Sequence, residues 1–321
     1  MLDGRHCRAF PHHPERREDG SAPGFGVAGL GDAEHGRNLG VGCLTPAAPG
    51  LLFAPRGRMP AASADMSDPI PLLDDTDPPP FRVAEGSPSS PFVIAADHAG
   101  RRIPRGLGTL GLEAAELDTH IAWDIGIGGV SQHLAAHLEA FYIAQAYSRL
   151  VIDCNRPLSA SSSIVQQSEY TVIPGNAHIT PAEAEARAQA IFHPYHDRID
   201  AELERRERAG QRTIFIAMHS FTPHFKGFDR PWHCGVLYNR DARLAVPLLD
   251  LLRREGLEVG DNQPYFVSDD TDYAIPRYGE GRGNLCIELE IRQDLITTDA
   301  QQTRWGELVA GVLLQAVATC G

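Results

Sequence analysis

Apolar runs alternate with helix-like patterns along most of the chain beyond residue 90. Runs typical of buried strands occupy residues 91–97, 213–218, 234–239 and 284–292. Residues 141–157 contain one or two further strands, the second at 150–153. Apolar residues recur at helical spacing in 112–124, 128–141, 180–210, 244–256 and 303–320. Strands that alternate with helices indicate an α/β fold with a mostly parallel sheet covered on both faces.

The segment 180–210 has the clearest helix signals. Thr180 is a typical N-cap, Pro181 occupies the first helical position, and Glu183 stands where a capping box places its carboxylate. The amphipathic pattern then continues to Gly210, a typical stop. These signals predict one long helix.

The N-terminal segment differs from this pattern. Residues 1–85 carry about half of the prolines and show no sustained apolar periodicity. Such a segment cannot bury enough apolar surface to offset its ordering entropy, so we expect a disordered extension or an over-long gene model. The run DPIPLLDDTDPPPF is the expected linker. Residues 86–321 are expected to form a single catalytic domain.

Composition narrows the possible partners and setting. The formal net charge is −13, which disfavours nucleic acid and anionic membranes as partners. An anionic substrate would need arginines placed within its site. The 6 cysteines form no CxxC pair, which favours reduced thiols and a cytoplasmic location. No apolar run approaches the roughly 18–20 residues that span a membrane, and there is no secretory signal.

Polar side chains suited to chemistry follow four of the predicted strands: His98, Asn155 with Arg156, His219, and Glu288 with Glu290. In an open α/β sheet, reactive groups gather at the carboxyl edge of the strands. We therefore expect these side chains to line one cleft.

Two histidines from separate strands and one carboxylate would make an open zinc site. His98 and His219 are the candidate ligands, and Asp124 is the best third ligand. Because Asp124 precedes a predicted helix, it could equally be a plain N-cap.

The carboxylates of Glu288 and Glu290 share one face of an otherwise apolar strand, which suits a general base beside a metal. Their alternative role is in salt bridges with Arg277, Arg282 or Arg292.

Candidate substrate-binding residues carry positive charge or can donate hydrogen bonds. Arg156 is suited to a substrate carboxylate, or alternatively to an ion pair with Asp153. His196, in a weak HxxH pattern on a predicted helix, and Arg230, in a polar loop, could also line the site.

Seven motifs, in this order, resemble the N-formylglutamate amidohydrolase family: DHAGRRIP, HIAWDIG, SRLVIDCNRP, FHPYH, MHSFTP, RPWHCGVLYNRD and EIRQDLI. They span roughly residues 90–300. The family is similar in fold to zinc carboxypeptidases and aspartoacylases. The resemblance therefore implies a three-layer α/β/α sandwich, phosphorylase/hydrolase-like, around a mixed, mostly parallel sheet. It also implies metal-dependent hydrolysis of N-formyl-L-glutamate to formate and glutamate, as in histidine catabolism.

Carried onto this chain, the resemblance makes His98 and His219 the metal histidines and Asp124 their acidic partner. It implies that Asn155 and Arg156 hold the substrate carboxylate, that Glu290 is the general base, and that the loop with Arg230 contributes to the pocket. One position departs from the carboxypeptidase pattern, because Arg101 stands where a Glu usually follows the first His by three residues.

The resulting hypothesis is an amidohydrolase that depends on zinc or another divalent metal and acts on a small carboxylate-bearing amide. A homo-oligomer is the expected assembly. One alternative is a non-catalytic ligand-binding protein with a degenerate metal site. Another is a hydrolase of the same fold acting on a different carboxylate-bearing amide. A metal-free hydrolase with Ser220 or Cys154 as nucleophile is the remaining alternative, although the sequence contains no GxSxG elbow.

Overall fold

The computed structural model describes residues 71–320 of the chain. Within this part, seven strands form the central sheet in the spatial order β1-β3-β2-β6-β11-β9-β10. Their bounds are β1 (Phe81–Ala84), β2 (Phe92–Ala96), β3 (Phe141–Gln145), β6 (Ile214–Phe221), β9 (Cys234–Leu237), β10 (Val259–Asp261) and β11 (Leu285–Arg292). Neighbouring strands are parallel except at the β1–β3 and β11–β9 pairs. The sheet is therefore mixed and mostly parallel, as predicted.

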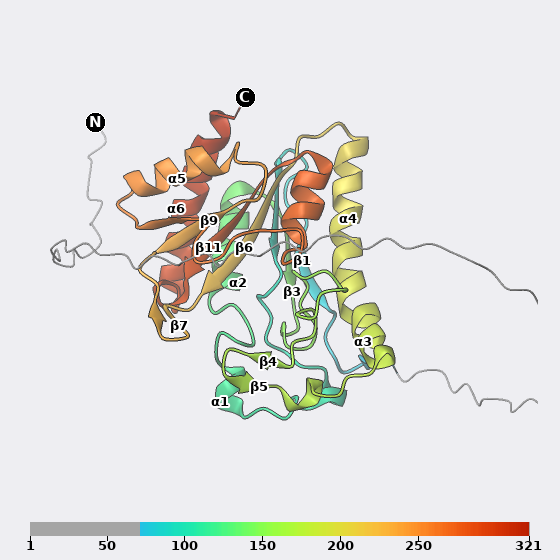
Figure 1. Ribbon diagram of the computed structural model, residues 1–321. Coiled ribbons are helices and arrows are strands. Elements are labelled where there is room, and N and C mark those ends of the chain that lie inside the picture. The colour runs from blue at the N-terminus through green and yellow to red at the C-terminus, as the bar shows by residue number, and fades with distance from the viewer. Residues whose placement is uncertain (1–70, 321) are drawn as a thin grey trace, which may run out of the picture. The chain divides into compact units, whose positions relative to one another are not determined.

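Helices cover both faces of this sheet, which gives three layers (Figure 1). On one side lie α2 (Ile127–Leu138), α5 (Ala245–Arg254) and α6 (Asp299–Ala318). On the other side lie α3 (Pro181–Arg187) and α4 (His193–Arg208). The short α1 (Ala114–Leu117) and the hairpins β4 (Gln167–Ser168) with β5 (Thr171–Val172) and β7 (His224–Phe225) with β8 (Phe228–Asp229) complete the fold. None of the described helices has the length and apolar character that a membrane crossing requires.

The predicted helix at 180–210 is confirmed, with one irregular turn. Thr180 and Glu183 form the capping box that the sequence indicates. Between α3 and α4, residues Ala188–Phe192 form a π-helical turn. Pro194 lies at the start of α4, and a proline lacks the N–H that would bond to the preceding turn. The wider turn accommodates this missing bond while the helix continues.

The central strands are apolar because both of their faces are covered. Every residue of β2, β3 and β6 is buried. β6 extends beyond the predicted end at Met218, since His219 to Phe221 continue the pairing with β11. His219 therefore lies inside a strand and not after it.

The second strand predicted at 150–153 is wrong. These residues are buried but form a turn, in which the Val151 N–H donates to the Ser148 carbonyl at 2.9 Å. The Asp153 N–H donates to the Ser163 carbonyl at 2.8 Å. A short apolar run is buried in either conformation, so its pattern could not distinguish a strand from a buried turn.

The N-terminal boundary also differs from the expectation. Of the extension predicted at 1–85, residues 1–70 lie outside the described residues. Residues 71–85 are described, and within them Phe81–Ala84 form β1, which pairs antiparallel with β3. Alternate residues of β1 are exposed, as expected for a short strand at a sheet edge, and four residues give too short a pattern to detect.

Candidate active site

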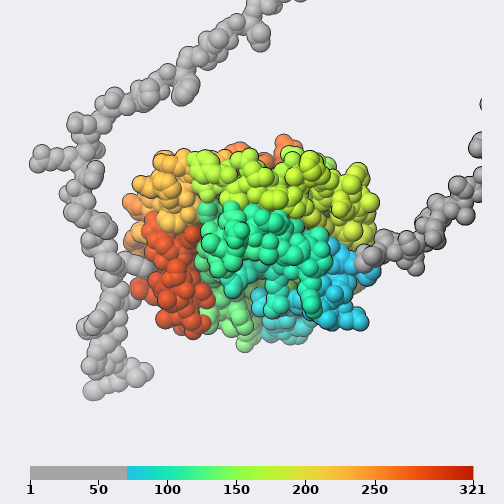
Figure 2. All heavy atoms as spheres, turned by 90° about the horizontal axis from the view of Figure 1, so that it is seen from below, coloured from blue at the N-terminus to red at the C-terminus, as the bar shows by residue number. Residues whose placement is uncertain are grey.

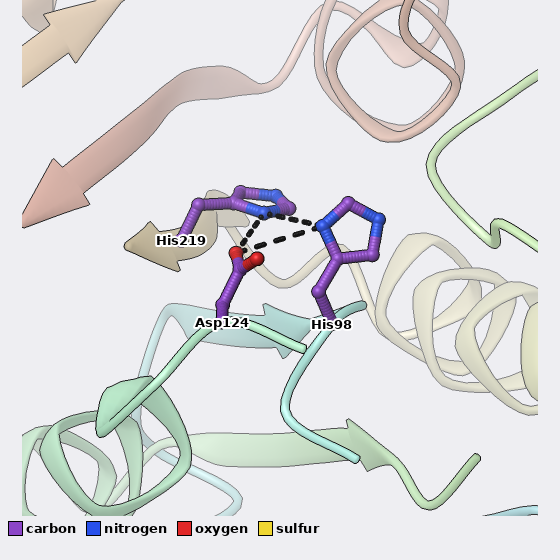
Figure 3. Close-up of side chains that lie close together, drawn as sticks. All are labelled: His98, Asp124 and His219. Atoms are coloured by element: carbon purple, nitrogen blue, oxygen red, sulfur yellow. Dashed lines mark hydrogen bonds and ion pairs between the residues drawn. The ribbon is translucent and has the colours of Figure 1, made fainter. Parts of the chain in front are cut away.

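Three side chains from distant parts of the chain converge at the carboxyl edge of the sheet (Figure 3). His98 follows β2, Asp124 precedes α2, and His219 lies near the end of β6. The Nδ1 atoms of His98 and His219 are 3.1 Å apart. Oδ2 of Asp124 lies 3.0 Å from Nδ1 of His219 and 3.5 Å from Nδ1 of His98. All three residues are buried, so the sequence prediction that they meet is confirmed.

Asp124 is not the N-cap of the following helix. The N-cap of α2 is Gly126, whose left-handed φ of 80° suits glycine. Asp124 instead turns its carboxylate to His219 and also accepts a hydrogen bond from the Ser220 N–H at 3.1 Å. Arg101, which stands where carboxypeptidases usually have a Glu, pairs with Asp118 at the surface. The carboxylate that lies beside the two histidines is that of Asp124.

A chain of hydrogen bonds from Arg149 through Asp153 fixes the ring of His98. Its Nε2 lies 2.7 Å from Oδ1 of Asp153. The other oxygen of Asp153 accepts from Nε and Nη2 of Arg149 at 3.1 and 2.7 Å. Burial opposes the charge on Asp153, but Arg149 and His98 outweigh it and hold its pKa well below the ordinary value. An ionised carboxylate on Nε2 leaves Nδ1 of His98 facing the shared point.

His219 has no such partner on its other ring nitrogen. Its Nε2 is buried and makes no hydrogen bond to any described residue. Oδ2 of Asp97 lies 3.7 Å from it and Oε2 of Glu288 lies 3.8 Å from it. Oδ2 of Asp97 is likewise buried without a partner, while its Oδ1 accepts from the Tyr195 hydroxyl at 2.6 Å. Buried polar groups without partners are costly and tend to mark functional positions.

Glu288 and Glu290 extend this acidic surface. β11 pairs in register with β6, so Glu290 lies directly beside His219. Both carboxylates are 4% exposed, and Oε2 of Glu290 has no hydrogen-bond partner.

The salt bridges considered for Glu288 and Glu290 are not formed. Arg277 and Arg282 pair with Asp200 instead. Arg292 pairs with Asp294. Both glutamates are therefore left to the site.

Charge within the site is unbalanced. Burial raises the pKa of Glu288 to about 7 and the pKa of Glu290 well above its ordinary value. Burial alone would lower the pKa of His219, but Glu288 and Asp124 raise it well above the ordinary value. Burial opposes the charge on Asp124, but His98 and His219 lower its pKa. Several carboxylates thus compete for little positive charge.

A divalent cation fits this donor set. Two imidazole nitrogens and a carboxylate oxygen are typical ligands of a catalytic zinc. Two nitrogens that each lie about 2.0–2.1 Å from a tetrahedral zinc are roughly 3.3 Å apart, close to the distance of 3.1 Å between the Nδ1 atoms. The cation would also supply the positive charge that the acidic surface lacks.

A cavity of about 390 Å³ opens onto these residues. Arg156 and Asn155 line it, beside Glu288 and Asp272. Arg156 does not pair with Asp153 through its side chain, because Arg149 occupies that carboxylate. The Asn155 side chain has a second task, since its Oδ1 accepts from the backbone N–H groups of residues 273 and 274.

Two sequence candidates do not reach the cavity. His196 is buried in an aromatic cluster, where its Nδ1 lies 2.7 Å from the Tyr278 hydroxyl and its ring contacts Phe192. Arg230 is 6% exposed and lies behind Phe225 and Tyr265. Residue spacing could place both near the site, but their aromatic neighbours enclose them.

Sequence patterns did not identify the residues that surround and orient the two histidines. Arg149 and Asp153 flank an apolar run, and charged residues that border a buried segment are a usable signal. Asp97, which adjoins His98 in sequence, gave no distinct signal. Phe225, Tyr265 and Phe266 also line the cavity. Phe225 belongs to the two-residue strand β7 and the other two lie in a loop, so none of them is part of a segment long enough to show a periodic pattern.

Known proteins are similar to this chain in sequence and in fold. The N-formylglutamate amidohydrolase family model matches residues 90–297. The crystal structure of gene product Atu2144 from Agrobacterium tumefaciens is 32% identical, with a TM-score of 0.75, covering 77% of this chain and 98% of that one. N-formylglutamate amidohydrolase from Ralstonia eutropha JMP134 is 18% identical, with a TM-score of 0.53, covering 74% of this chain and 98% of that one, and it supports the fold. No curated protein matches the chain.

Proposed function

Because the chain belongs to the N-formylglutamate amidohydrolase family and is an amidohydrolase, we propose that it cleaves an N-acyl amino acid in a metal-dependent reaction. N-formyl-L-glutamate is the reference substrate, and its products would be formate and glutamate. The observation that carries the proposal is the convergence of His98, Asp124 and His219 beside Glu290 in one cavity.

Three atoms would hold the metal: Nδ1 of His98, Nδ1 of His219 and Oδ2 of Asp124. A bound zinc ion would supply Lewis-acid polarisation of the amide carbonyl and a lower pKa for water. Asp153 fixes the ring of His98 so that Nδ1 faces the site.

Glu290 is the proposed general base. Its unpartnered Oε2 takes a proton from the attacking water as the water oxygen bonds to the acyl carbon. Glu290 then gives that proton to the nitrogen as the C–N bond breaks, so the products are a carboxylic acid and an amine. Glu288 lies against Nε2 of His219, where it supports the ring and the charge of the site.

Arg156 is the proposed anchor for the substrate carboxylate. Within residues 71–320, its one carboxylate contact is Asp272 at 3.7 Å, beyond hydrogen-bond length, so its guanidinium can pair with an incoming anion. Asn155 holds this end of the cavity together, because its amide bonds to the 273–274 backbone and lies 3.4 Å from Glu288.

The direct test is formate release from N-formyl-L-glutamate and a panel of N-acyl amino acids. We expect turnover with zinc, loss after chelation and recovery on adding the metal back. Full activity after thorough metal removal would contradict the metal dependence, and metal binding without turnover of any substrate would favour a non-catalytic binding protein.

A metal-free nucleophile is disfavoured by the geometry. The Ser220 hydroxyl donates to the Ile125 carbonyl at 2.9 Å, and burial raises the pKa of the Cys154 thiol well above its ordinary value. Four expectations from the sequence stay predictions. They are a cytoplasmic location, a homo-oligomeric state, the lack of nucleic-acid and membrane partners, and a role in histidine catabolism.

A further inference from the structure

The cavity offers one available cation for a substrate anion. Arg149 and Arg156 are the arginines among its lining residues. Arg149 is committed to Asp153 at 2.7 Å and lies 3.5 Å from Asp124. Arg156 is therefore the one that can pair with a substrate carboxylate. Its Nη1 donates to the Asn155 carbonyl at 2.9 Å, and the carboxylate that it contacts among the described residues, that of Asp272, lies 3.7 Å away, beyond hydrogen-bond length.

His120 does not provide a second anion site. It lines the cavity, but its Nε2 faces the Glu169 carboxylate at 3.2 Å. Burial also lowers the pKa of His120, which favours the neutral ring. A substrate with two carboxylates, such as N-formyl-L-glutamate, would find a match for one of them.

Arg230 could have been that second cation, but aromatic rings separate it from the cavity. Its guanidinium carbon lies 4.6 Å from the Phe225 ring centre and 4.7 Å from that of Tyr265. Nη1 donates to the Tyr265 hydroxyl at 3.0 Å and to the Thr222 carbonyl at 3.4 Å. Arg230 is thus satisfied by cation–π contacts and hydrogen bonds, and Phe225 and Tyr265 line the cavity in its place.

These two rings belong to an aromatic wall, defined as Phe225, Tyr265 and Phe266. Phe266 is 68% exposed and Tyr265 is 40% exposed although both line the cavity. Large apolar side chains exposed beside a cavity that also holds convergent polar groups are typical of a ligand site. The end of the molecule that carries the β4–β5 hairpin (yellow-green), next to the α1 segment (teal), is seen in Figure 2.

The aromatic wall and Arg156 line the same cavity. Arg156 adjoins Asn155, whose Nδ2 is 3.4 Å from Oε2 of Glu288. Phe225, Tyr265 and Phe266 line the same cavity of about 390 Å³ as Arg156 and the proposed metal ligands. A substrate whose carboxylate is anchored at Arg156 would therefore share this cavity with aromatic side chains.

We propose that the enzyme prefers N-acyl amino acids with one carboxylate and an apolar or aromatic side chain over N-formyl-L-glutamate. The proposal rests on the proposed amidohydrolase function and names its substrate class. Arg156 holds the α-carboxylate, and the aromatic wall contacts the side chain. The second carboxylate of glutamate would instead lose water against apolar rings without gaining a charged partner.

The test compares N-formyl-L-phenylalanine with N-formyl-L-glutamate on the zinc-loaded full chain. We expect kcat/KM to favour the phenylalanine compound by roughly tenfold or more, as expected when an apolar group fills an apolar pocket. Calorimetric binding of the same two compounds to metal-stripped protein should give the same order of affinity. A ratio at or below one in either measurement overturns the proposal.

These two readouts separate the proposal from its premise. Absence of turnover with every N-acyl compound would defeat the proposed function, while the binding preference would still decide whether the pocket selects an apolar side chain.

Substitutions of Phe266 sharpen the test, because this residue is exposed and its replacement leaves the core intact. Phe266→Arg supplies the missing second cation and should lower the phenylalanine-to-glutamate ratio by roughly tenfold. Phe266→Ala should lower the ratio by weakening binding of the phenylalanine compound. The matched control is Phe228→Ala, an aromatic that is 58% exposed and does not line the cavity, and its ratio should equal that of the wild type. Unchanged ratios in both Phe266 variants would overturn the proposal.

Discussion

His98 and His219 turn the same ring nitrogen, Nδ1, toward one point, but their other nitrogens meet different surroundings. Nε2 of His98 bonds to Asp153, which Arg149 holds in turn. Nε2 of His219 has no hydrogen-bond partner and faces acidic oxygens at 3.7 and 3.8 Å. One half of the site is completely hydrogen-bonded, and the other half is not.

This difference suggests separate roles for the two histidines: one ring is held in place, and the other lies among groups that can still bind or exchange protons. A ring within a closed hydrogen-bond chain keeps its orientation before any ligand arrives. The His219 half contains the buried atoms without a hydrogen-bond partner among the described residues, including Oε2 of Glu290, which is free to take up a proton. In the proposed mechanism, the bonded half keeps the ring of His98 in position, and the half without these bonds contributes the general base Glu290.

The largest expected effect concerns Glu290, on the unsatisfied half. Glu290→Gln keeps the shape of the side chain but removes the base, so kcat should fall about 10²–10⁴-fold. Zinc affinity, measured by chelator competition, should stay close to wild type because Glu290 is not among the three proposed ligands. Retention of most of the activity would contradict its role as general base.

The second prediction breaks the closed chain on the His98 half. Asp153→Asn removes the charge that orients His98 and pairs with Arg149, so zinc affinity should fall roughly 10–100-fold. Chelator competition measures this loss, and circular dichroism checks the fold. Asp118→Asn serves as the control, since it removes a surface partner of Arg101 and should leave zinc affinity unchanged.

His196 is a third buried histidine, and its surroundings predict how the stability of the protein depends on pH. Aromatic side chains surround His196, and burial lowers its pKa to about 3, in contrast to His219 among carboxylates. The unfolded state takes up a proton near pH 6.5 and the folded state only near pH 3, so this residue costs stability as the pH falls through that window. At pH 5 the cost is about 2 kcal/mol relative to pH 8.

Urea unfolding at both pH values tests this contribution. His196→Gln should narrow the stability difference between pH 8 and pH 5 by about 2 kcal/mol, whatever its effect at pH 8. His137→Gln, at an exposed position on α2, should show the wild-type difference. An unchanged pH difference in His196→Gln would show that burial does not keep the ring neutral.

The smallest expected effect is that of replacing Asp97, the carboxylate beside Nε2 of His219, on zinc affinity. Asp97→Asn alters a carboxylate that makes no hydrogen bond to the ring, so zinc affinity should change by about twofold or less, below the value of one hydrogen bond. Its matched partner is Asp153→Asn, measured by the same chelator competition. A loss as large as that of Asp153→Asn would show that both histidines are held alike, and the comparison between the halves would fail.

Much of the fold and of the site could be predicted from the sequence by itself. Continuous apolar runs predicted the buried strands β2 and β6, because a strand covered on both faces is apolar on both. In β11 the apolar residues alternate with Glu288 and Glu290, and this alternation predicted two carboxylates on one face. The polar residues at their ends predicted the meeting of His98 and His219, since parallel strands bring their carboxyl ends to one edge. The motif order predicted the family.

Only the tertiary structure decided how those residues are supported and which neighbours face the cavity. The contact between His98 and Asp153 joins residues 55 positions apart, and no local periodicity encodes it. The same limit hid the turn at 150–153 and the aromatic rings that separate Arg230 from the cavity. Periodicity reports whether a segment is buried, whereas side-chain direction and pairing depend on elements that meet only when the chain folds.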